Sequence, residues 1–293
     1  MLDFMALPGM LYLIINNYVP MGGLFIAFKN IDYGKGIFGS DWSGFKNFKF
    51  LFRSSDAFII VRNTLLYNLV FIILGCIMGI IVGLLLNEII SRVMKKAYQT
   101  IILLPQLISI IIVAYIVYAL FSNEAGFINN HILAPLELDK INFYHEKKYW
   151  PFIIVFVQIW KSIGYDSIIY FSAILSVDKN LFEAATIDGA GRWKQMWYVT
   201  LPLIKPIAIT LILMKTGRIF YSDFGLFYQV PMNSGSLYSV TNTIDTYVYR
   251  ALINFNDVGM SSAAGVFQSV VGFVVILAVN GIVRKVDREN SLF

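Results

Sequence analysis

Charged residues are scarce in this 293-residue chain, and cysteine is nearly absent. Only 14% of positions are charged, whereas 58% are hydrophobic and 16% are aromatic. This balance lies far outside that of soluble domains, so lipid is expected to be the solvent for most of the chain. The single cysteine, Cys76, excludes a disulfide framework and a Cys-based metal site, and we expect it to be a small buried apolar residue.

Patterns that carry chemistry are also missing. The chain has no Ser-His-Asp, H-E-x-x-H or Cys-His arrangement and no G-x-x-x-x-G-K-[ST] phosphate loop, so we predict no catalytic residues and no nucleotide site. His131 and His145 lie far from any carboxylate cluster, so no metal site is expected either. The formal charge of +5 does not indicate nucleic-acid binding, because Lys and Arg lie between apolar runs instead of on one face.

Apolar runs long enough to cross a bilayer are abundant. A spanning helix needs about 20 mostly apolar residues. Six segments meet this length, at residues 6–28, 64–89, 98–121, 151–175, 206–230 and 263–283. We therefore predict an all-α membrane protein with six transmembrane helices, forming one domain over residues 1–293 with its core spans at about 64–283.

The basic residues favour one orientation of these spans. Six spans place both termini on one side, and the loops on that side are short and basic. Their Lys and Arg residues are Arg92, Lys95, Lys96, Lys179, Arg192, Lys194, Lys205, Arg284, Lys285 and Arg288. The positive-inside rule then predicts a multi-pass protein of the plasma membrane with both termini in the cytoplasm. No basic segment precedes the first span, so we read it as a retained helix and not as a signal peptide.

Two features of the second span predict helix contacts. Gly75, Gly79 and Gly83 recur at intervals of four, which places three small residues on one face for close packing against another helix. Glu88, near the inner end, is expected to be an interfacial residue or an ion-pair partner of Lys95 or Lys96.

A polar loop separates the fourth and fifth spans. Its first part reads as a short helix broken by Gly189 and Gly191, and its second part, residues 192–202, reads as an amphipathic helix ending at Pro202. So polar a segment cannot lie in hydrocarbon, yet its apolar side chains need cover. A protein partner is one possible cover, and the membrane surface is the other.

This loop resembles that of the binding-protein-dependent ABC importers, whose permeases share the pattern E-A-A, three residues, G, nine residues, I, one residue, L-P. The matching residues are Glu183, Ala184, Ala185, Gly189, Val199, Leu201 and Pro202, with Val199 replacing Ile. The resemblance implies that residues 183–202, Asp188 included, are coupling helices in a cleft of an ATPase. Glu183 would make polar contacts there, while Ala184 and Ala185 would permit close packing. Two ATPase subunits would bind ATP and Mg, leaving this chain without a cofactor.

The resemblance covers almost the whole chain and is closest to permeases for sugars and polysaccharide fragments. It is carried by Leu7-Pro8-Gly9, Tyr18-Val19-Pro20-Met21-Gly22-Gly23, Ile244-Asp245-Thr246-Tyr247-Val248-Tyr249-Arg250 and Gly265-Val266-Phe267-Gln268-Ser269. It implies a second homologous permease subunit, an oligosaccharide substrate and an extracytoplasmic solute-binding protein. We expect that protein to contact the outer loops 29–62, 122–150 and 231–260.

Ionisable residues within the fourth and fifth spans mark a candidate pathway, because such residues are costly in lipid. They are Lys161, Asp166, Lys215, Arg218 and Asp223. Helical spacing places Lys161, Ser162 and Tyr165 on one face of the fourth span. The same spacing groups Met214, Arg218, Tyr221 and Ser222 on the fifth. Similarity to the maltose-type permease implies sugar contacts at Ser162, Tyr165, Met214, Gly217, Arg218 and Tyr221.

The charge of the substrate stays open at this point. Lys161 and Arg218 could recognise a carboxylate or sulfate on an acidic sugar. Alternatively, Asp166 and Asp223, or a partner subunit, neutralise them. Three other functions also compete: an ABC importer for a peptide, amino acid or oxyanion, a membrane-embedded enzyme, and a transporter driven by an ion gradient.

Overall fold

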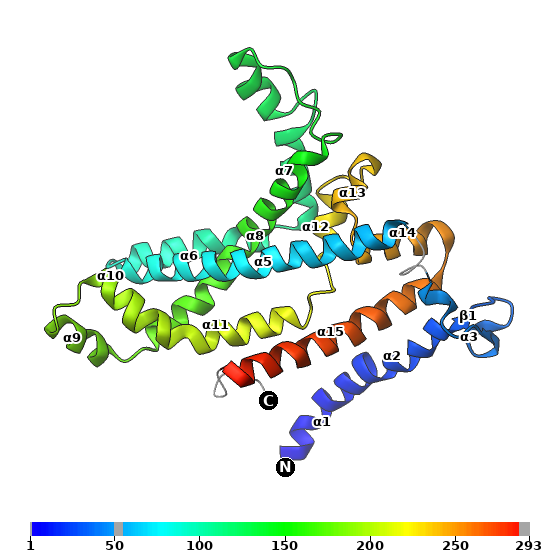
Figure 1. Ribbon diagram of the computed structural model, residues 1–293, viewed down its shortest axis with the longest axis horizontal. Helices are drawn as coiled ribbons and strands as arrows, with labels where there is room; N and C mark the ends of the chain where they lie inside the picture. The colour runs from blue at the N-terminus through cyan, green and yellow to red at the C-terminus, as the bar shows by residue number, and fades with distance from the viewer. Residues whose placement is uncertain (1, 50–54, 287–293) are drawn as a thin grey trace.

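The computed structural model describes residues 2–49 and 55–286 and is almost entirely helical (Figure 1). Arg288 lies outside the described residues. In the described part of the chain the single sheet pairs β1 (Lys29–Asn30) with β2 (Asp41–Trp42) in antiparallel register. The main helices are α1 (Leu2–Leu13), α2 (Val19–Met21), α3 (Gly36–Gly39), α5 (Ser55–Glu88), α6 (Arg92–Leu107), α7 (Ile110–Phe121), α8 (Trp150–Leu175), α9 (Lys179–Ile187), α10 (Arg192–Gln195), α11 (Leu201–Thr216), α12 (Phe224–Gln229), α13 (Tyr238–Thr241), α14 (Ile244–Phe255) and α15 (Val258–Val286).

The predicted spans correspond to these helices with two corrections. Within residues 2–49 and 55–286, five helical stretches are long and apolar enough to cross a membrane, at Met5–Phe28, Asp56–Glu88, Lys147–Leu175, Arg192–Thr216 and Val258–Lys285. A sixth crossing requires α6 and α7 to be taken as one broken span. The all-α membrane fold is therefore confirmed.

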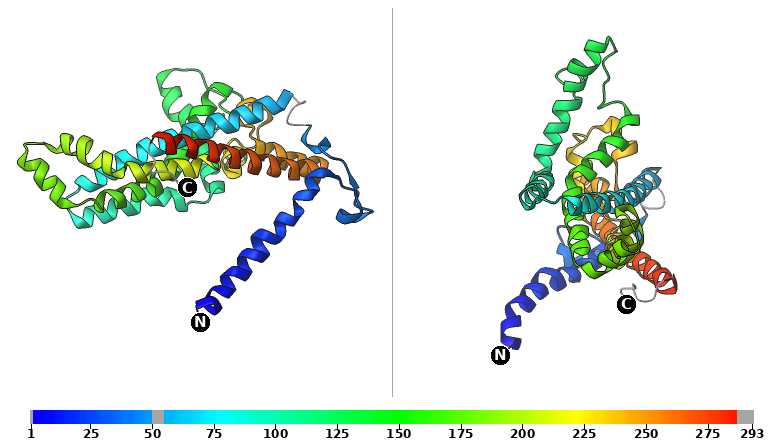
Figure 2. Two further views of the ribbon diagram at one scale, coloured as in Figure 1. Left: turned by 60° about the horizontal axis from the view of Figure 1, so that its bottom comes forward. Right: turned by 90° about the vertical axis from the view of Figure 1, so that its left-hand side faces the viewer.

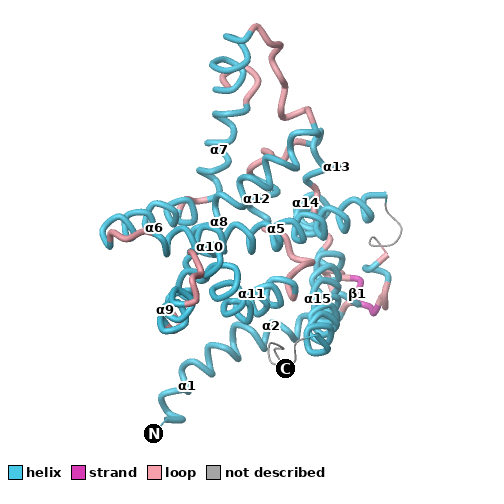
Figure 3. The backbone as a smooth tube through the Cα atoms, turned by 60° about the vertical axis from the view of Figure 1, so that its left-hand side comes forward, coloured by secondary structure: helices cyan, strands magenta, loops and turns pink. Residues whose placement is uncertain are grey.

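The first correction concerns the third predicted span, 98–121, which is not one helix. The α6 and α7 helices meet at an angle of 92°, so α7 leaves the direction of α6 (Figure 3). Ile108 is extended where the helix ends, and the Ser109 hydroxyl accepts a hydrogen bond from the Ile111 amide at the start of α7. A capped new helix begins at Ser109, and this local signal overrides the continuous apolar pattern.

The second correction concerns the fifth predicted span, 206–230. Its helix begins at Arg192 and ends at Thr216, followed by turns and the short α12. The amphipathic helix of the loop therefore does not end at Pro202. A π-helical turn, η7 (Met196–Thr200), precedes this proline. Its wider winding accommodates a residue that lacks an amide hydrogen and crowds the carbonyl four positions earlier.

The bundle is held by glycine contacts around α8. As predicted, Gly75, Gly79 and Gly83 of α5 pack closely, and the partner is α8. A Cβ at Gly79 would lie 3.0 Å from the Tyr170 ring. Gly164 of α8, which the sequence pattern did not single out, meets the α6 backbone even more closely, since a Cβ there would lie 2.0 Å from the Ile102 carbonyl oxygen.

The predicted burial of Cys76 is only partial. This side chain on α5 is half-buried, and the Tyr170 hydroxyl of α8 lies 3.3 Å from its Sγ atom. Cys76 is thus a contact between the two most extensively packed helices.

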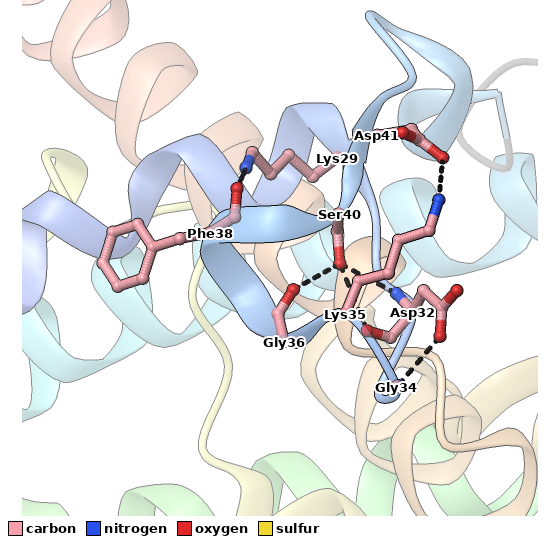
Figure 4. A network of polar contacts seen from close by, with 8 residues as sticks. All are labelled: Lys29, Asp32, Gly34, Lys35, Gly36, Phe38, Ser40 and Asp41. Atoms are coloured by element: carbon pink, nitrogen blue, oxygen red, sulfur yellow. Dashed lines mark hydrogen bonds and ion pairs between the residues drawn. The ribbon is translucent and has the colours of Figure 1, made fainter.

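The N-terminal stretch of α1 and α2 points away from the other helices (Figure 2). Large apolar side chains along it, such as Met10 and Tyr18, are exposed. A small hairpin follows, in which the buried Lys29 donates to the carbonyl oxygens of Ile37 and Phe38. Figure 4 shows the bond to Phe38. This hairpin lies at the end of the bundle opposite to α9 and α10 (Figure 1).

Candidate functional site

The loop between α8 and α11 forms the predicted helix-turn-helix. The α9 helix carries Glu183, Ala184 and Ala185, and its N-cap is Asp178, whose carboxylate accepts a hydrogen bond from the Asn180 amide at 3.0 Å. Asp188 caps the C-terminus of α9, and Gly189 follows with φ +76°, a left-handed conformation that favours glycine. Leu201 and Pro202 lie beyond the turn, at the start of α11. The motif is thus split over two helices that Gly189 joins.

Large apolar side chains on this loop are uncovered. Ile187 is 87% exposed, Trp193 75% and Tyr198 80%. Several large aromatic and aliphatic side chains exposed on one short loop are typical of a protein interface.

Two contacts hold the loop's own geometry. The Gln195 side-chain amide donates to the Thr186 hydroxyl at 2.9 Å and to the Ala190 carbonyl at 3.0 Å, which ties α10 to α9. Glu88 forms its ion pair with Arg192 at 2.8 Å, so the predicted pairing with Lys95 or Lys96 is wrong. The fold returns Arg192 to the end of α5 across 104 residues, a contact that sequence proximity could not reveal.

Lys161 does not pair with Asp166. Its ammonium group donates to the carbonyl oxygens of Pro105, Gln106 and Ile108 at 3.3, 3.1 and 2.6 Å. These carbonyls lie at the end of α6, where a helix carries partial negative charge, and the Pro105 carbonyl also accepts from the Ile108 amide. The three hydrogens of the ammonium are matched by three acceptors, which leaves none for a sugar.

Asp166 pairs instead with Lys215, whose Nζ atom lies 2.9 and 2.8 Å from its two carboxylate oxygens. The pair joins α8 to α11 and lies against Gly75 of α5, whose missing side chain leaves room for it. Asp223 does not neutralise Arg218, because its carboxylate caps α12 through the Leu226 amide at 3.0 Å. Asp166 is therefore neutralised within the chain, but by Lys215 and not by Lys161 as predicted.

The remaining predicted site residues divide into two groups. Gly217 and Ser222 make packing and polar contacts within the protein: a Cβ at Gly217 would lie 2.8 Å from Ile276 Cδ1, and the Ser222 hydroxyl lies 2.7 Å from the Asp245 carboxylate and from the Thr243 hydroxyl. Residues 217–223 are not helical, so the predicted helical face of Arg218, Tyr221 and Ser222 does not exist.

The second group is open to a ligand. Tyr165 is 59% and Met214 60% exposed, and the ion pair between their sequence neighbours places them at the same level of α8 and α11. Ser162 is half-buried on α8. Exposed Arg218 lies over the ring of Tyr221, with 5.9 Å from Cζ to the ring centroid.

Ser269 joins this group although the sequence did not mark it as a site residue. Its hydroxyl lies 2.8 Å from that of Tyr221. Ser269 comes from α15, and its place beside the fifth span becomes visible only in the folded chain.

Residues 72–288 match the model of the family described as binding-protein-dependent transport system inner membrane components. The chain belongs to this family. The predicted recognition is thus confirmed, together with the transport role, whereas the membrane-enzyme and ion-gradient alternatives are contradicted. The protein is an integral membrane permease component whose transport depends on a solute-binding protein.

Similar proteins cover nearly the whole chain. Protein LplB of Bacillus subtilis (strain 168) is 37% identical over 290 residues, 99% of this chain and 90% of its own length. The polygalacturonan/rhamnogalacturonan transport system permease protein YteP of the same organism is 35% identical, covering 99% and 89%. Among solved structures, a bacterial alginate ABC transporter in complex with an alginate pentasaccharide-bound periplasmic protein is 34% identical with a TM-score of 0.86, covering 97% of this chain and 94% of that one.

Proposed function

We propose that this chain is one of two homologous permease subunits of an ATP-driven importer for an acidic oligosaccharide. Two similar proteins support the substrate class: one is the permease for polygalacturonan and rhamnogalacturonan, and the other is described as importing the acidic polysaccharide alginate. The observation that carries the proposal within this chain is Arg218, an exposed cation beside an aromatic ring in the broken fifth span.

The open side chains suit a sugar ring with a carboxylate. The Arg218 guanidinium supplies paired donors for the carboxylate. Tyr165 and Tyr221 supply aromatic faces for the apolar sides of pyranose rings, while Ser162 and Met214 complete the lining. Lys161, Gly217 and Ser222 shape the walls through the contacts described above.

The loop at 183–202 is the proposed docking element for one of two ATPase subunits, which bind ATP and Mg while this chain binds no cofactor. Exposed Ile187, Trp193 and Tyr198 would be covered in the ATPase cleft, where Glu183 and Asp188 make polar contacts. Movement of the loop would be passed to α8 and α11, which it connects.

The loop end of the bundle is the proposed cytoplasmic end, which puts both termini on that side. Arg192, Lys194 and Lys179 lie in this loop, in keeping with the positive-inside rule. The hairpin of β1 and β2 is then extracytoplasmic.

The hairpin is a candidate contact for the solute-binding protein. Phe38, Trp42 and Phe45 are exposed on it. The turn beneath them is held by Ser40, whose hydroxyl donates to Gly36 and accepts from the Asp32 amide, and by the Lys35–Asp41 ion pair at 3.0 Å (Figure 4).

Transport by the complete importer tests the proposal. The chain would be reconstituted in proteoliposomes with its partner permease, ATPases and binding protein, and uptake of labelled oligogalacturonate, oligoalginate and maltopentaose would be measured with ATP. We expect uptake of an acidic oligosaccharide, and a loss of about tenfold in Arg218→Gln, because a hydrogen-bonded charge is removed. Arg284→Gln, an exposed arginine on α15, is the matched control and should transport normally. Uptake of maltopentaose alone would refute the acidic class, and uptake of none would refute an oligosaccharide substrate.

A further inference from the structure

The break between α11 and α12 is capped by side chains from other helices. Asn68 of α5 donates through its side-chain amide to the carbonyl oxygens of Ile219 and Tyr221, at 2.9 Å each. Gln268 of α15 donates to the carbonyl oxygen of Phe220 at 2.7 Å. Three consecutive carbonyls of a non-helical segment are thus satisfied by two amides that are 200 positions apart in the sequence.

Such capping is needed because the break lies inside the bundle. Asn68 is 20 residues from the Glu88 end of α5, or about 30 Å along the helix. Phe220 and the Gln268 side chain that caps its carbonyl are buried, and a buried backbone carbonyl without a partner is costly. Amides supply neutral donors, so the break is satisfied without adding a charge beside Arg218. The Asn68 amide also reaches the Thr64 carbonyl of its own helix at 2.9 Å.

Asp245 of α14 contacts both Ser222, in the same break, and the side chain of Gln268. One of its carboxylate oxygens accepts from the Ser222 amide and the Ser222 hydroxyl, both at 2.7 Å. Its two oxygens also face the Gln268 side-chain nitrogen at 3.2 Å. A carboxylate at this position requires the NH₂ end of Gln268 to face it, which sets the orientation of the amide that caps Phe220.

Residues 217–223, whose carbonyls these side chains cap, contain the proposed sugar contacts Arg218 and Tyr221. Phe220 is buried in an apolar cluster with Ile60, Ile244 and Ala264. Arg218 and Tyr221, which flank it, are not part of this cluster: Arg218 is exposed and lies over the Tyr221 ring. We infer that Asn68 and Gln268 are positioning residues for substrate: they hold the 217–223 backbone so that Arg218 and Tyr221 face the pathway. This inference rests on the proposed function. A substrate-facing group must be held to within about 0.5 Å for full effect.

Asn63 provides a matched control on the same helix. Its side-chain amide also donates to two main-chain carbonyls, Ser239 at 3.2 Å and Asn242 at 2.9 Å, but these lie outside the break. Asn63→Leu and Asn68→Leu both remove a side-chain amide that donates to main-chain carbonyls; Asn63 is the more buried of the two and also accepts from Arg62, so its loss is the more severe control. Only Asn68→Leu releases the segment that carries Arg218.

The decisive quantity is oligosaccharide uptake per ATP hydrolysed, measured in the reconstituted importer and normalised to assembled complex. We expect Asn68→Leu to lower this ratio by about tenfold, because misplaced contacts fail while the ATPases still respond to the loaded binding protein. Gln268→Met, of equal length but without donors, should do the same and serves where Asn68→Leu does not assemble. Asn63→Leu should leave the ratio unchanged even if less complex forms.

Equal ratios in the Asn63 and Asn68 variants, or an unchanged ratio in Gln268→Met, would overturn the inference. In that case a lowered ratio in Arg218→Gln would show that the proposed function stands. Absence of oligosaccharide uptake in the unmodified importer would overturn the proposed function, and this inference with it.

Discussion

The loop at residues 183–202 and the breaks after α6 and α11 differ in how far apart in the sequence their contacting residues lie. In the loop, the contacts that shape the turn are local, although the Arg192–Glu88 ion pair ties the loop to α5: Gln195 reaches Thr186 nine residues away, and the turn depends on one dihedral angle of Gly189. In the broken spans they are distant, since Lys161 caps carbonyls more than 50 residues away and Asn68 caps carbonyls more than 150 away. A motif at fixed spacing can therefore describe the loop, whereas the breaks are specified by tertiary structure.

The largest effect is expected from Gly164→Ala, which disturbs a contact between helices that are distant in the sequence, α8 and α6. The new Cβ would lie 2.0 Å from the Ile102 carbonyl oxygen, and only separation of α6 from α8 relieves this overlap. We expect a destabilisation of about 3 kcal/mol or more and little assembled complex. Thermal denaturation in detergent and the yield of monodisperse complex measure it. Gly265→Ala on α15, where no atom lies within 4 Å of the new Cβ, is the control; equal melting of the two variants would contradict the packing argument.

Gly189→Val tests the local contacts and should have the next largest effect. No atom lies within 4 Å of a Cβ there, so the change strains only the backbone, at about 1–2 kcal/mol for a left-handed residue. We expect uptake and binding-protein-stimulated ATP hydrolysis to fall about tenfold while membrane insertion persists. Gly191→Val is matched, since Gly191 is equally open but has φ −68°. Normal uptake in Gly189→Val would show that the turn is not needed for coupling.

Lys161→Met should have the smallest effect and separates a capping role from a substrate role. Loss of the three hydrogen bonds to the end of α6 is expected to cost about 1–3 kcal/mol of stability. The ratio of acidic to neutral oligosaccharide uptake should stay unchanged, unlike in Arg218→Gln. Lys140→Met, at an exposed loop position, controls for the lost charge. A lowered ratio in Lys161→Met alone would restore Lys161 as a substrate contact.

The same division explains what could be predicted from the sequence. Hydropathy located the long helices, and the motif located the coupling loop, because both signals lie in contiguous residues. The end of α11 at Thr216 was missed, since the donors that make a break tolerable there lie on α5 and α15.

Lys161 was noticed for a sound reason, the cost of a cation in lipid, and its contact with the substrate stays a prediction. Its acceptors are backbone carbonyls of α6, and no side-chain pattern can announce them. Asn68 and Gln268 were polar residues in apolar helices and carried a weaker form of the same signal. Once the break after α11 is known, these two polar residues can be identified as the donors to its backbone carbonyls.

The ion pair between Asp166 and Lys215 has a mechanical consequence. It joins α8 to α11 at a point 12 residues before Asp178 and 23 residues after Arg192. The two helices are therefore connected twice, by the loop and by this ion pair. Neither helix can slide along the other without separating charges of which one is almost fully buried. We therefore expect a movement of the loop to carry α8 and α11 together, up to Arg218 just beyond the end of α11.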